Sequence, residues 1–194
     1  MSKSLSLSNN KPVNPYEFDV RRDFEPEVVA RSLSNICRYV GHHGWMSVAE
    51  HSLIVANVMG FRWDKAPTTD LRHDWRMLGL LHDSMEMLFG DIPTPVKSHP
   101  NFDFLRALEN KYLREVFKLH KLFPTRTVLE ELHNADRFAM SIELEHLGQY
   151  SNPMWSEHIA AYPREKYPHV NALGIDAQEA EAMWLLAYNN WSRV

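Results

Sequence analysis

Apolar residues recur along most of this chain at the three- and four-residue spacing of amphipathic helices. Val28, Val29 and Leu33 form one such stripe after Pro26, which can open a helix that we expect to run to about Arg38. Later spacings predict further helices over about 48–59, 71–89, 103–120, 126–147 and 176–191. Because no strand-type alternation and no Asn-Gly or Asp-Gly turn occurs, we predict an all-α fold with about six helices.

The segments between these helices are polar or rich in helix-breaking residues. Residues 1–16 are polar and contain two prolines, so we expect an extended arm. Residues 90–95 hold two prolines and a glycine that end a helix firmly, and residues 148–173 form a loop-rich segment. Ser47 and Glu50 have the spacing of a capping box, which predicts a helix start at Val48.

Composition places the chain among ordinary globular proteins. Its 194 residues predict a single domain over 1–194, with 44% hydrophobic and 24% charged residues. The net charge of -4 argues against a nucleic acid polymer or an anionic membrane as partner. No apolar run approaches the roughly 20 residues that span a bilayer. The single cysteine, Cys37, excludes a disulfide framework, and the N-terminus lacks the apolar core of a signal peptide, so we expect a cytoplasmic protein.

The dipeptide His-Asp occurs twice in the helix predicted over about 71–89, as His73-Asp74 and as His82-Asp83. The nine-residue separation of the two histidines places them on opposite helical faces, at about 100° per residue. The first pair lies among charged residues near the helix start, which indicates a solvated first turn. We therefore expect that only the second pair faces the interior.

The second pair follows the apolar run 77–81, so His82 and Asp83 should be partly buried. Glu86 lies one helical turn further, and Asp91 lies just past the expected helix end. Three carboxylates therefore gather at a helix C-terminus, where the helix dipole is also negative. A bound cation would relieve this charge, and a hydrogen-bonded structural cluster is the alternative.

Two distant residues extend this set. His51 lies in the first turn of a predicted helix and is followed by an apolar run. Asp136 lies mid-helix between apolar neighbours, where a buried carboxylate without a partner is destabilising by about 3–5 kcal/mol. Each alone is more often a core polar residue than a ligand, but with His82 and Asp83 they form an ordered group of two histidines and two aspartates.

In this order, the four residues resemble the H…HD…D set of the HD-domain metal-dependent phosphohydrolases. The stretches SVAEHSLIVA, LLHDSMEMLFGDIPTPVK and NADRFAMSIE are similar to the branch that contains the 5′-deoxynucleotidases and phage-encoded dATP triphosphohydrolases. The likeness covers about residues 30–145. It implies an HD-domain helical bundle in which His51, His82, Asp83 and Asp136 bind one divalent metal.

The resemblance assigns acid–base roles to Glu86 and Asp91, in the pattern HDxxE followed by GD. We expect Glu86 to orient or activate the nucleophile and Asp91 to assist or protonate the leaving group, or the reverse. Asp91 could instead only cap the turn before Pro93. Imidazole and carboxylate ligands suit Mn²⁺, Co²⁺, Fe²⁺, Zn²⁺ or Ni²⁺ without choosing among them, and an additional Mg²⁺ is conceivable with a polyphosphate substrate.

Substrate contacts are expected from four further residues. By the resemblance, Arg38 would bind phosphate, and Tyr39 would pack at the sugar and disfavour ribose, although these enzymes usually have tryptophan there. Alternatively, Arg38 would only interact with a helix C-terminal dipole. Thr94 could contact the substrate. Lys97 could add positive charge for a longer polyphosphate, or be solvated.

These assignments favour hydrolysis of the 5′-phosphate ester of a 2′-deoxynucleoside monophosphate. Triphosphates, notably dATP, are the second substrate class, because attack at the ester nearest the sugar does not depend on the length of the phosphate chain. A signalling phosphodiesterase and a helical binding protein with a structural metal are the competing hypotheses.

The resemblance also suggests a homodimer or a higher homo-oligomer. The apolar C-terminal helix, with Trp184 and Trp191, is a plausible contact surface. We expect all six tryptophans, Trp155 included, in the core or at an interface rather than stacked on a base. A bacterial or phage-encoded enzyme of nucleotide-pool control would fit this description.

Overall fold

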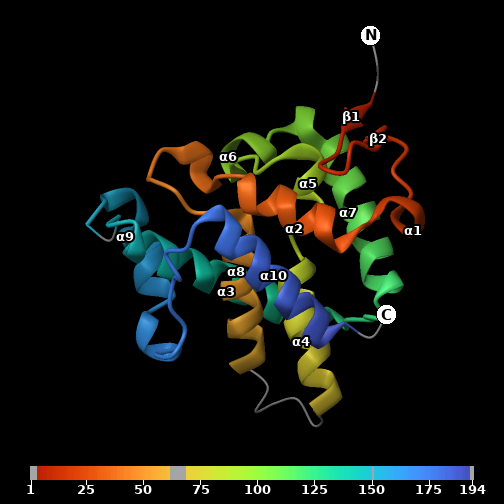
Figure 1. Cartoon of the computed structure of the whole chain (residues 1–194). Helices are drawn as coiled ribbons and strands as arrows, with labels where there is room; N and C mark the ends of the chain where they lie inside the picture. The colour runs from red at the N-terminus through yellow and green to blue at the C-terminus, as the bar shows by residue number, and fades with distance from the viewer. Residues whose placement is uncertain (1–3, 62–68, 150, 193–194) are drawn as a thin grey trace.

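The computed structural model describes residues 4–61, 69–149 and 151–192, and it confirms the all-α prediction (Figure 1). Helices pack around one hydrophobic core, and a two-stranded hairpin lies at the N-terminal end. The described elements are β1 (Leu5–Ser6), β2 (Pro12–Val13), α1 (Val20–Asp23), α2 (Pro26–Asn35), η1 (Arg38–Gly41), α3 (Val48–Phe61), α4 (Thr69–Leu81), α5 (Glu86–Phe89), α6 (Thr94–Lys97), η3 (Pro100–Phe102), α7 (Asp103–Leu119), α8 (Arg126–His146), α9 (Pro153–Ala161), η4 (Arg164–Lys166) and α10 (Ala177–Trp191).

Helix α3 lies at the centre, in contact with α2, α4, α8 and α10. Nearly all of its residues are buried, so it is apolar all round rather than amphipathic. Its closest neighbour is α4, where Gly79 lets the two backbones approach. A Cβ atom at Gly79 would lie only 2.7 Å from the Ala56 Cα atom. This contact fixes the distance between the two helices that carry most of the site described below.

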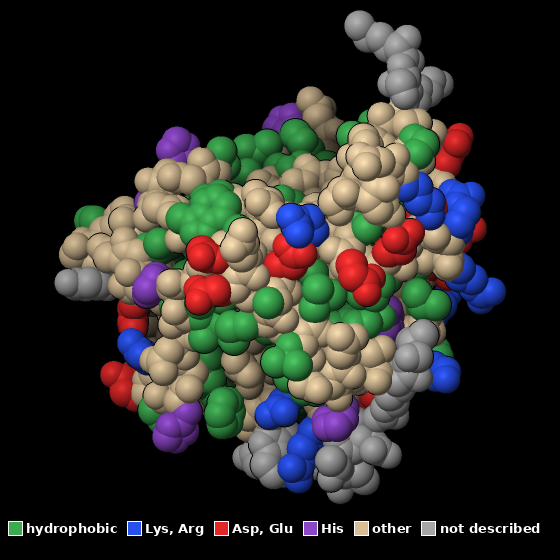
Figure 2. All heavy atoms as spheres, in the orientation of Figure 1, with side chains coloured by type: hydrophobic (Ala, Val, Ile, Leu, Met, Phe, Trp, Pro, Cys, Tyr) green, Lys and Arg blue, Asp and Glu red, His purple; other side chains and the backbone are tan. Residues whose placement is uncertain are grey.

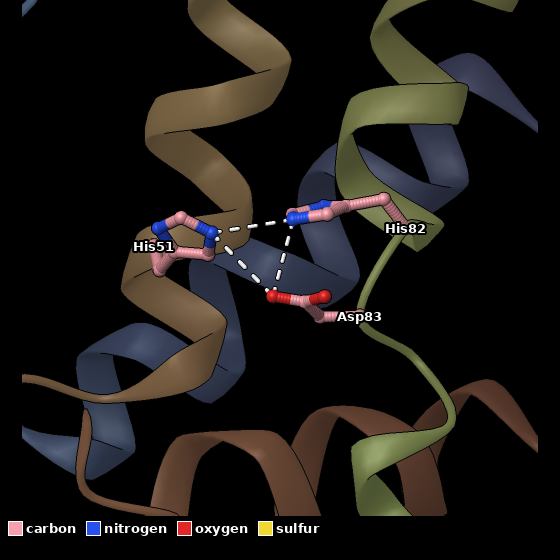
Figure 3. Close-up of side chains that lie close together, drawn as sticks. All are labelled: His51, His82 and Asp83. Atoms are coloured by element: carbon pink, nitrogen blue, oxygen red, sulfur yellow. Dashed lines mark hydrogen bonds and ion pairs between the residues drawn. The ribbon is translucent and has the colours of Figure 1, made fainter. Parts of the chain in front are cut away.

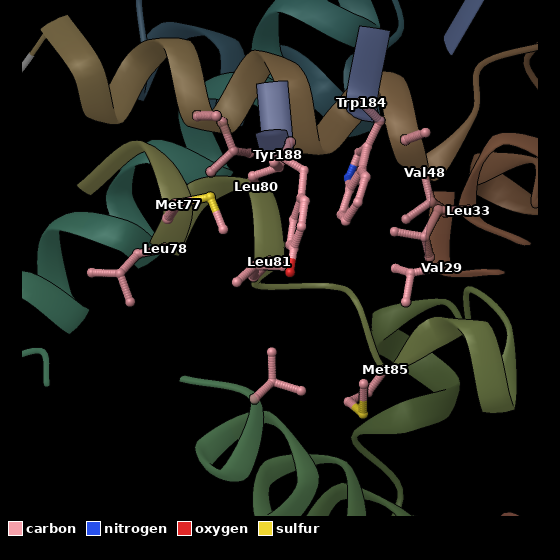
Figure 4. Packing of buried hydrophobic residues seen from close by; sticks show 14 of the residues in the cluster. Val29, Leu33, Val48, Met77, Leu78, Leu80, Leu81, Met85, Trp184 and Tyr188 are labelled. Carbon is pink, nitrogen blue, oxygen red and sulfur yellow. The ribbon is translucent and has the colours of Figure 1, made fainter. Parts of the chain in front are cut away.

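Helix α10 closes the core over α2 and α3. Trp184 and Tyr188 stack with ring centroids 5.6 Å apart and are inserted among core side chains such as Leu33 and Leu81 (Figure 4). Trp184 is 0% exposed, so the suggestion that it forms part of a dimer surface is wrong. Its large apolar ring instead packs in the hydrophobic core of the same chain.

The predicted extended arm is wrong in part, because β1 and β2 pair as an antiparallel hairpin. Leu7 and Val13 are buried against the core on either side of its turn. Asn10 adopts a φ of 63°, a left-handed conformation that asparagine tolerates well. Strands of two residues are too short to show the alternation that predicts a strand.

The helix predicted over 71–89 is interrupted. Helix α4 ends at Leu81, residues 82–85 form a turn, and α5 begins at Glu86. The His82 Nδ1 atom donates to the Gly79 carbonyl at 2.7 Å, and in a continuing helix this carbonyl would accept the N–H of Asp83. The break turns Asp83 toward the interior, and it means that Glu86 is not on the same helix as His82.

Two other predicted boundaries need correction. Helix α2 ends at Asn35, three residues before Arg38. Helix α3 begins at Val48 as predicted, since the Ser47 hydroxyl accepts the Glu50 N–H at 3.1 Å. The capping box is only half formed, because the Glu50 carboxylate accepts the N–H groups of residues 173 and 174 instead, at 2.7 and 2.9 Å.

The helices expected over 103–120, 126–147 and 176–191 correspond closely to α7, α8 and α10. Within the described part of the chain, none of the helices is long and apolar enough to cross a bilayer. On the face shown in Figure 2, basic side chains lie beside acidic ones.

Candidate metal centre and active site

Four side chains from three separate helical regions converge inside the bundle. His51 lies on α3, His82 and Asp83 directly follow α4, and Asp136 lies on α8. His51 Nε2 lies 3.2 Å from His82 Nε2 and 3.4 Å from Asp83 Oδ2. The same Asp83 oxygen is 3.1 Å from His82 Nε2, and Asp136 Oδ1 is 3.2 Å from His51 Nε2. Figure 3 shows the first three of these side chains pointing toward one another.

In each of the two imidazoles, the hydrogen bond made by Nδ1 leaves Nε2 as the atom that can bind a metal. His82 Nδ1 contacts the Gly79 carbonyl, and His51 Nδ1 contacts the Glu143 carboxylate. Both partners can only accept, so each Nδ1 carries a hydrogen and each Nε2 of a neutral ring presents its lone pair. Two lone pairs therefore face each other beside two carboxylates. This donor set is repulsive alone and suits a divalent transition metal.

The pKa values of His51 and Asp83 reflect the same excess of negative charge at this centre. Burial and the Arg38 guanidinium act to lower the pKa of His51, but the Glu143 and Asp136 carboxylates raise it to about 10. Burial alone would raise the pKa of Asp83, and the neighbouring imidazoles lower it instead. In the absence of a metal, a proton on His51 balances these carboxylates. A metal displaces that proton, because an imidazole ligand must be neutral.

Glu143 holds His51 and Arg38 in position, and it was not predicted from the sequence. Its carboxylate is 0% exposed. One oxygen contacts His51 Nδ1, and the other accepts from Arg38 Nε at 3.0 Å and from the Tyr39 hydroxyl at 2.6 Å. Burial would raise the pKa of Glu143, but Arg38 and His51 lower it to about 2. The available signal was its spacing, since it lies seven residues after Asp136 on the same helical face.

Arg38 and Tyr39 lie in a strained segment that is held in place on both sides. The Arg38 N–H donates to the Met46 carbonyl at 2.8 Å. Tyr39 and Val40 both have φ near 55°, which is unusual for a β-branched residue such as valine. Because α2 ends before it, Arg38 is not a helix-terminal cation. Its Nη1 atom instead lies 4.0 Å from Asp83 Oδ2, close to the metal centre.

The two acid–base candidates lie at the edge of the same centre. Glu86 is 7% exposed, and its Oε2 atom has no hydrogen-bond partner among the described residues. Burial, together with the negative charges of Asp83 and Asp91, holds the pKa of Glu86 well above its usual value. Asp91 accepts the Tyr39 N–H at 3.2 Å, so it links two chain segments rather than only capping its own turn.

Two cavities adjoin the centre. The larger, of about 820 Å³, is lined by Arg38, Tyr39, Asp91, Thr94 and Asp136, and mainly by apolar and imidazole side chains beyond them. The smaller, of about 200 Å³, is polar, and its lining residues are His82, Asp83, Met85, Glu86, Lys97, Arg106, Glu109, Asn110 and Leu113. No residue lines both. Among the proposed ligands, Asp136 lines the larger cavity, His82 and Asp83 line the smaller one, and the buried His51 lines neither.

Lys97 and His73 both lie outside the larger cavity. Lys97 lines the smaller one, where its Nζ atom forms an ion pair with Glu109 Oε2 at 2.7 Å. His73 lies on α4 more than two turns before His82, and it belongs neither to the metal-ligand group nor to the lining of either cavity.

Comparison with known proteins agrees with this geometry. The family model of the HD domain matches residues 36–147, a segment that contains all four proposed ligands. An uncharacterized protein of Rhodobacter capsulatus is 28% identical over 136 residues, which cover 66% of this chain and 65% of that protein. The uncharacterized protein YfdR of Escherichia coli K12 is 26% identical over 129 residues, covering 66% and 63%. The aligned region thus spans slightly less than two-thirds of these curated relatives. Since the family model covers more than half of the 194 residues, this chain belongs to the HD domain family.

Proposed function

We propose that this protein is a metal-dependent phosphohydrolase that cleaves the 5′-phosphate ester of 2′-deoxynucleoside monophosphates. The observation that carries the proposal is the pair of facing imidazole nitrogens of His51 and His82, with Asp83 and Asp136 beside them. Arg38 lies next to this group, with its Nη1 atom 4.0 Å from Asp83 Oδ2. HD domains hold divalent metals, and the group of His51, His82 and Asp83 provides two nitrogen donors and one oxygen donor. Asp136 Oδ1, 3.2 Å from His51 Nε2, is the candidate for a second oxygen donor.

In this proposal His51, His82, Asp83 and Asp136 hold the metal. The bound metal supplies a Lewis acid for a phosphoryl oxygen and lowers the pKa of a water. Arg38 binds the phosphate through the guanidinium nitrogens that Glu143 does not occupy.

The carboxylates complete the reaction by moving protons. Water attacks phosphorus, the bond from phosphorus to the 5′-oxygen breaks, and the leaving oxygen must gain a proton. Glu86 orients or activates the water, and Asp91 assists or protonates the leaving oxygen. Glu86 Oε2 is buried and has no hydrogen-bond partner among the described residues, so a water bound at the site would satisfy it.

Tyr39 is the candidate for sugar selection. Its hydroxyl is bound to Glu143 and its N–H to Asp91, so the ring is held rigidly at the wall of the larger cavity. A fixed ring against the sugar leaves little space for a 2′-hydroxyl. Thr94 also lines this cavity and is a candidate for a substrate contact.

The test is a substrate panel with protein loaded with Co²⁺ or Mn²⁺. The four deoxynucleoside monophosphates should release phosphate, and the corresponding ribonucleotides should react much more slowly. Equal rates for ribose and deoxyribose substrates would contradict the role proposed for Tyr39 in sugar selection. Absence of turnover with every nucleotide would overturn the proposed activity.

A deoxynucleoside triphosphate, notably dATP, is the second candidate substrate. The smaller cavity favours it, because Lys97 and Arg106 provide two cations beside His82 and Asp83. Glu86 and Glu109 line the same cavity, so a bound triphosphate would need an additional Mg²⁺ to offset their charge. Product analysis distinguishes the two reactions, since this candidate predicts release of intact triphosphate.

A further inference from the structure

We propose that α9 forms the base-binding wall of the larger cavity and that the ring of Trp155 packs against the nucleobase of the substrate. The inference rests on the proposed function for the identity of the ligand. It corrects the expectation that every tryptophan belongs to the core or to an interface, because Trp155 is half-buried and lines the cavity.

One wall of this cavity is a continuous face of α8. His133, Asp136, Arg137 and Met140 line it, and their spacings of three, four and seven residues place them on one side of the helix. The proposed metal ligand Asp136 therefore lies on the same surface as Met140, one helical turn away. A substrate that occupies the larger cavity with its phosphate near Asp136 extends along this face.

Helix α9 supplies the wall beyond this face, through Met154, Trp155 and His158. It is tied to α8 by His158, whose Nε2 atom donates to the Arg137 carbonyl at 2.8 Å. Arg137 in turn donates to the Tyr162 hydroxyl at 3.3 Å. Trp155 is thus held at a defined position relative to Asp136, although the two lie on different helices.

The chemistry of this region suits a planar aromatic base. The indole ring of Trp155, with the thioethers of Met140 and Met154 in the same cavity, offers a flat, polarisable surface without charge. Any nucleobase can stack on such a surface. The volume of about 820 Å³ exceeds the needs of a phosphate group and lies in the range typical of sites for small organic ligands. The imidazoles of His133 and His158 add hydrogen-bonding groups at the edge of this surface.

This wall lies outside the part of the chain that matches the HD domain family. That match ends at residue 147, whereas α9 covers Pro153–Ala161. The metal centre, Arg38 and the α8 face fall within the match, whereas the α9 part of the proposed base site lies beyond it.

The test compares Trp155→Ala, Trp155→Phe and a control, Trp45→Ala, in the metal-loaded full chain. Trp45 is 49% exposed and lines neither cavity. Trp155→Ala should raise KM for the deoxynucleoside monophosphates about 5- to 100-fold, the range expected for the loss of a base–aromatic contact. Its kcat should change little. Trp155→Phe should remain near wild type, because the indole N–H that it removes has no partner among the described residues.

Inhibition by the two products separates base binding from general damage. In Trp155→Ala, the inhibition constant for the 2′-deoxynucleoside should rise in parallel with KM, while that for inorganic phosphate stays unchanged. Equal increases for both products, or no increase for the nucleoside, would overturn the inference.

If the wild-type protein hydrolyses no nucleotide, the proposed function fails and calorimetric titration with dAMP tests the wall independently. Weaker binding of dAMP to Trp155→Ala than to wild type would support the inference that α9 forms a base-binding wall. Equal binding to the two proteins, or no binding to wild type, would overturn it.

Discussion

Glu143 is the residue on which the phosphate candidate and a metal ligand both depend. It contacts His51 and Arg38 through different oxygens and is fully buried. We expect Glu143→Gln to weaken metal affinity about 10- to 100-fold, since the amide holds the His51 tautomer less well. Titration with Co²⁺ followed by visible absorption measures this. Glu130→Gln on the exposed side of α8 is the control, and equal affinities in both variants would contradict the role of Glu143.

The two His-Asp pairs differ by their position relative to the end of α4. His82 joins the metal group, and His73 does not. His82→Ala should therefore purify without the metal, whereas His73→Ala should retain it. Metal analysis of the two proteins decides the matter, and loss of metal from both would show that the ligand assignment is wrong.

Single residues of the site were predictable to different degrees. His51, His82, Asp83 and Asp136 stand out because each is an ionisable residue beside an apolar run. The role of Glu143 depends on contacts with α3 and with η1, which are remote in sequence. Periodicity places its side chain on the face of Asp136, but it does not identify these partners.

At the scale of elements, the contact between α3 and α4 sets the geometry of the metal centre. A Cβ atom at Gly79 would meet the backbone of Ala56 and Val55, at 2.7 to 3.0 Å. We expect Gly79→Ala to lower the free energy of unfolding by about 1–3 kcal/mol. The higher helix propensity of alanine stabilises the fold by less than the overpacking between α3 and α4 destabilises it. Metal affinity should also fall, since α3, which carries His51, moves away from α4, which leads directly into His82.

Gly60→Ala in α3 is the matched control for this change. There the three atoms nearest to the added methyl group all belong to the flexible side chain of Arg76 rather than to backbone. Because that side chain can shift, the loss of stability should be smaller than for Gly79→Ala. Chemical denaturation of both variants measures the difference. Equal stability of Gly79→Ala and wild type would contradict the close-packing argument.

Element boundaries were less predictable than element positions. The 3.6-residue period placed α7, α8 and α10 well, because their apolar stripes and caps are local in sequence. The end of α4 depends on a side chain that captures a carbonyl, and the end of α2 depends on an isolated bridge between Cys37 and Ser47. These interactions involve tertiary geometry that apolar spacing does not encode.

At the scale of the whole molecule, His120 links the stability of the fold to pH. It is 2% exposed and joins α7 to α10 through a 2.8 Å hydrogen bond to the Tyr188 hydroxyl. Burial lowers the pKa of His120, although a hydrogen bond to the Val116 carbonyl opposes this. The folded state therefore takes up a proton less readily than the unfolded state, whose histidine titrates near 6.5.

The stability that neutral His120 contributes is complete above pH 6.5 and is lost as pH falls toward its folded pKa. The free energy of unfolding of wild type minus that of His120→Gln should decrease between pH 7 and 5, by at most about 1.4 kcal/mol per pH unit. Denaturation curves at several pH values measure this difference. A difference that is constant or rises on acidification would contradict the assignment.

The all-α class followed from periodicity alone, but the wider arrangement did not. The hairpin and the wall formed by α9 bring together residues far from the core pattern, and the burial of Trp184 removes one proposed contact surface. A homodimer or higher oligomer remains a prediction. On α10, the exposed apolar side chains available for such a contact are Met183 and Leu186.

The central claim is that the metal centre is catalytic rather than structural. The most direct measurement compares metal content and phosphate release from deoxynucleoside monophosphates for wild type and Glu86→Gln. We predict that both proteins hold the metal and that turnover falls by about 100-fold or more in the variant, the usual contribution of an acid–base group. Bound metal with no turnover by wild type, or equal turnover by the two proteins, would contradict the account.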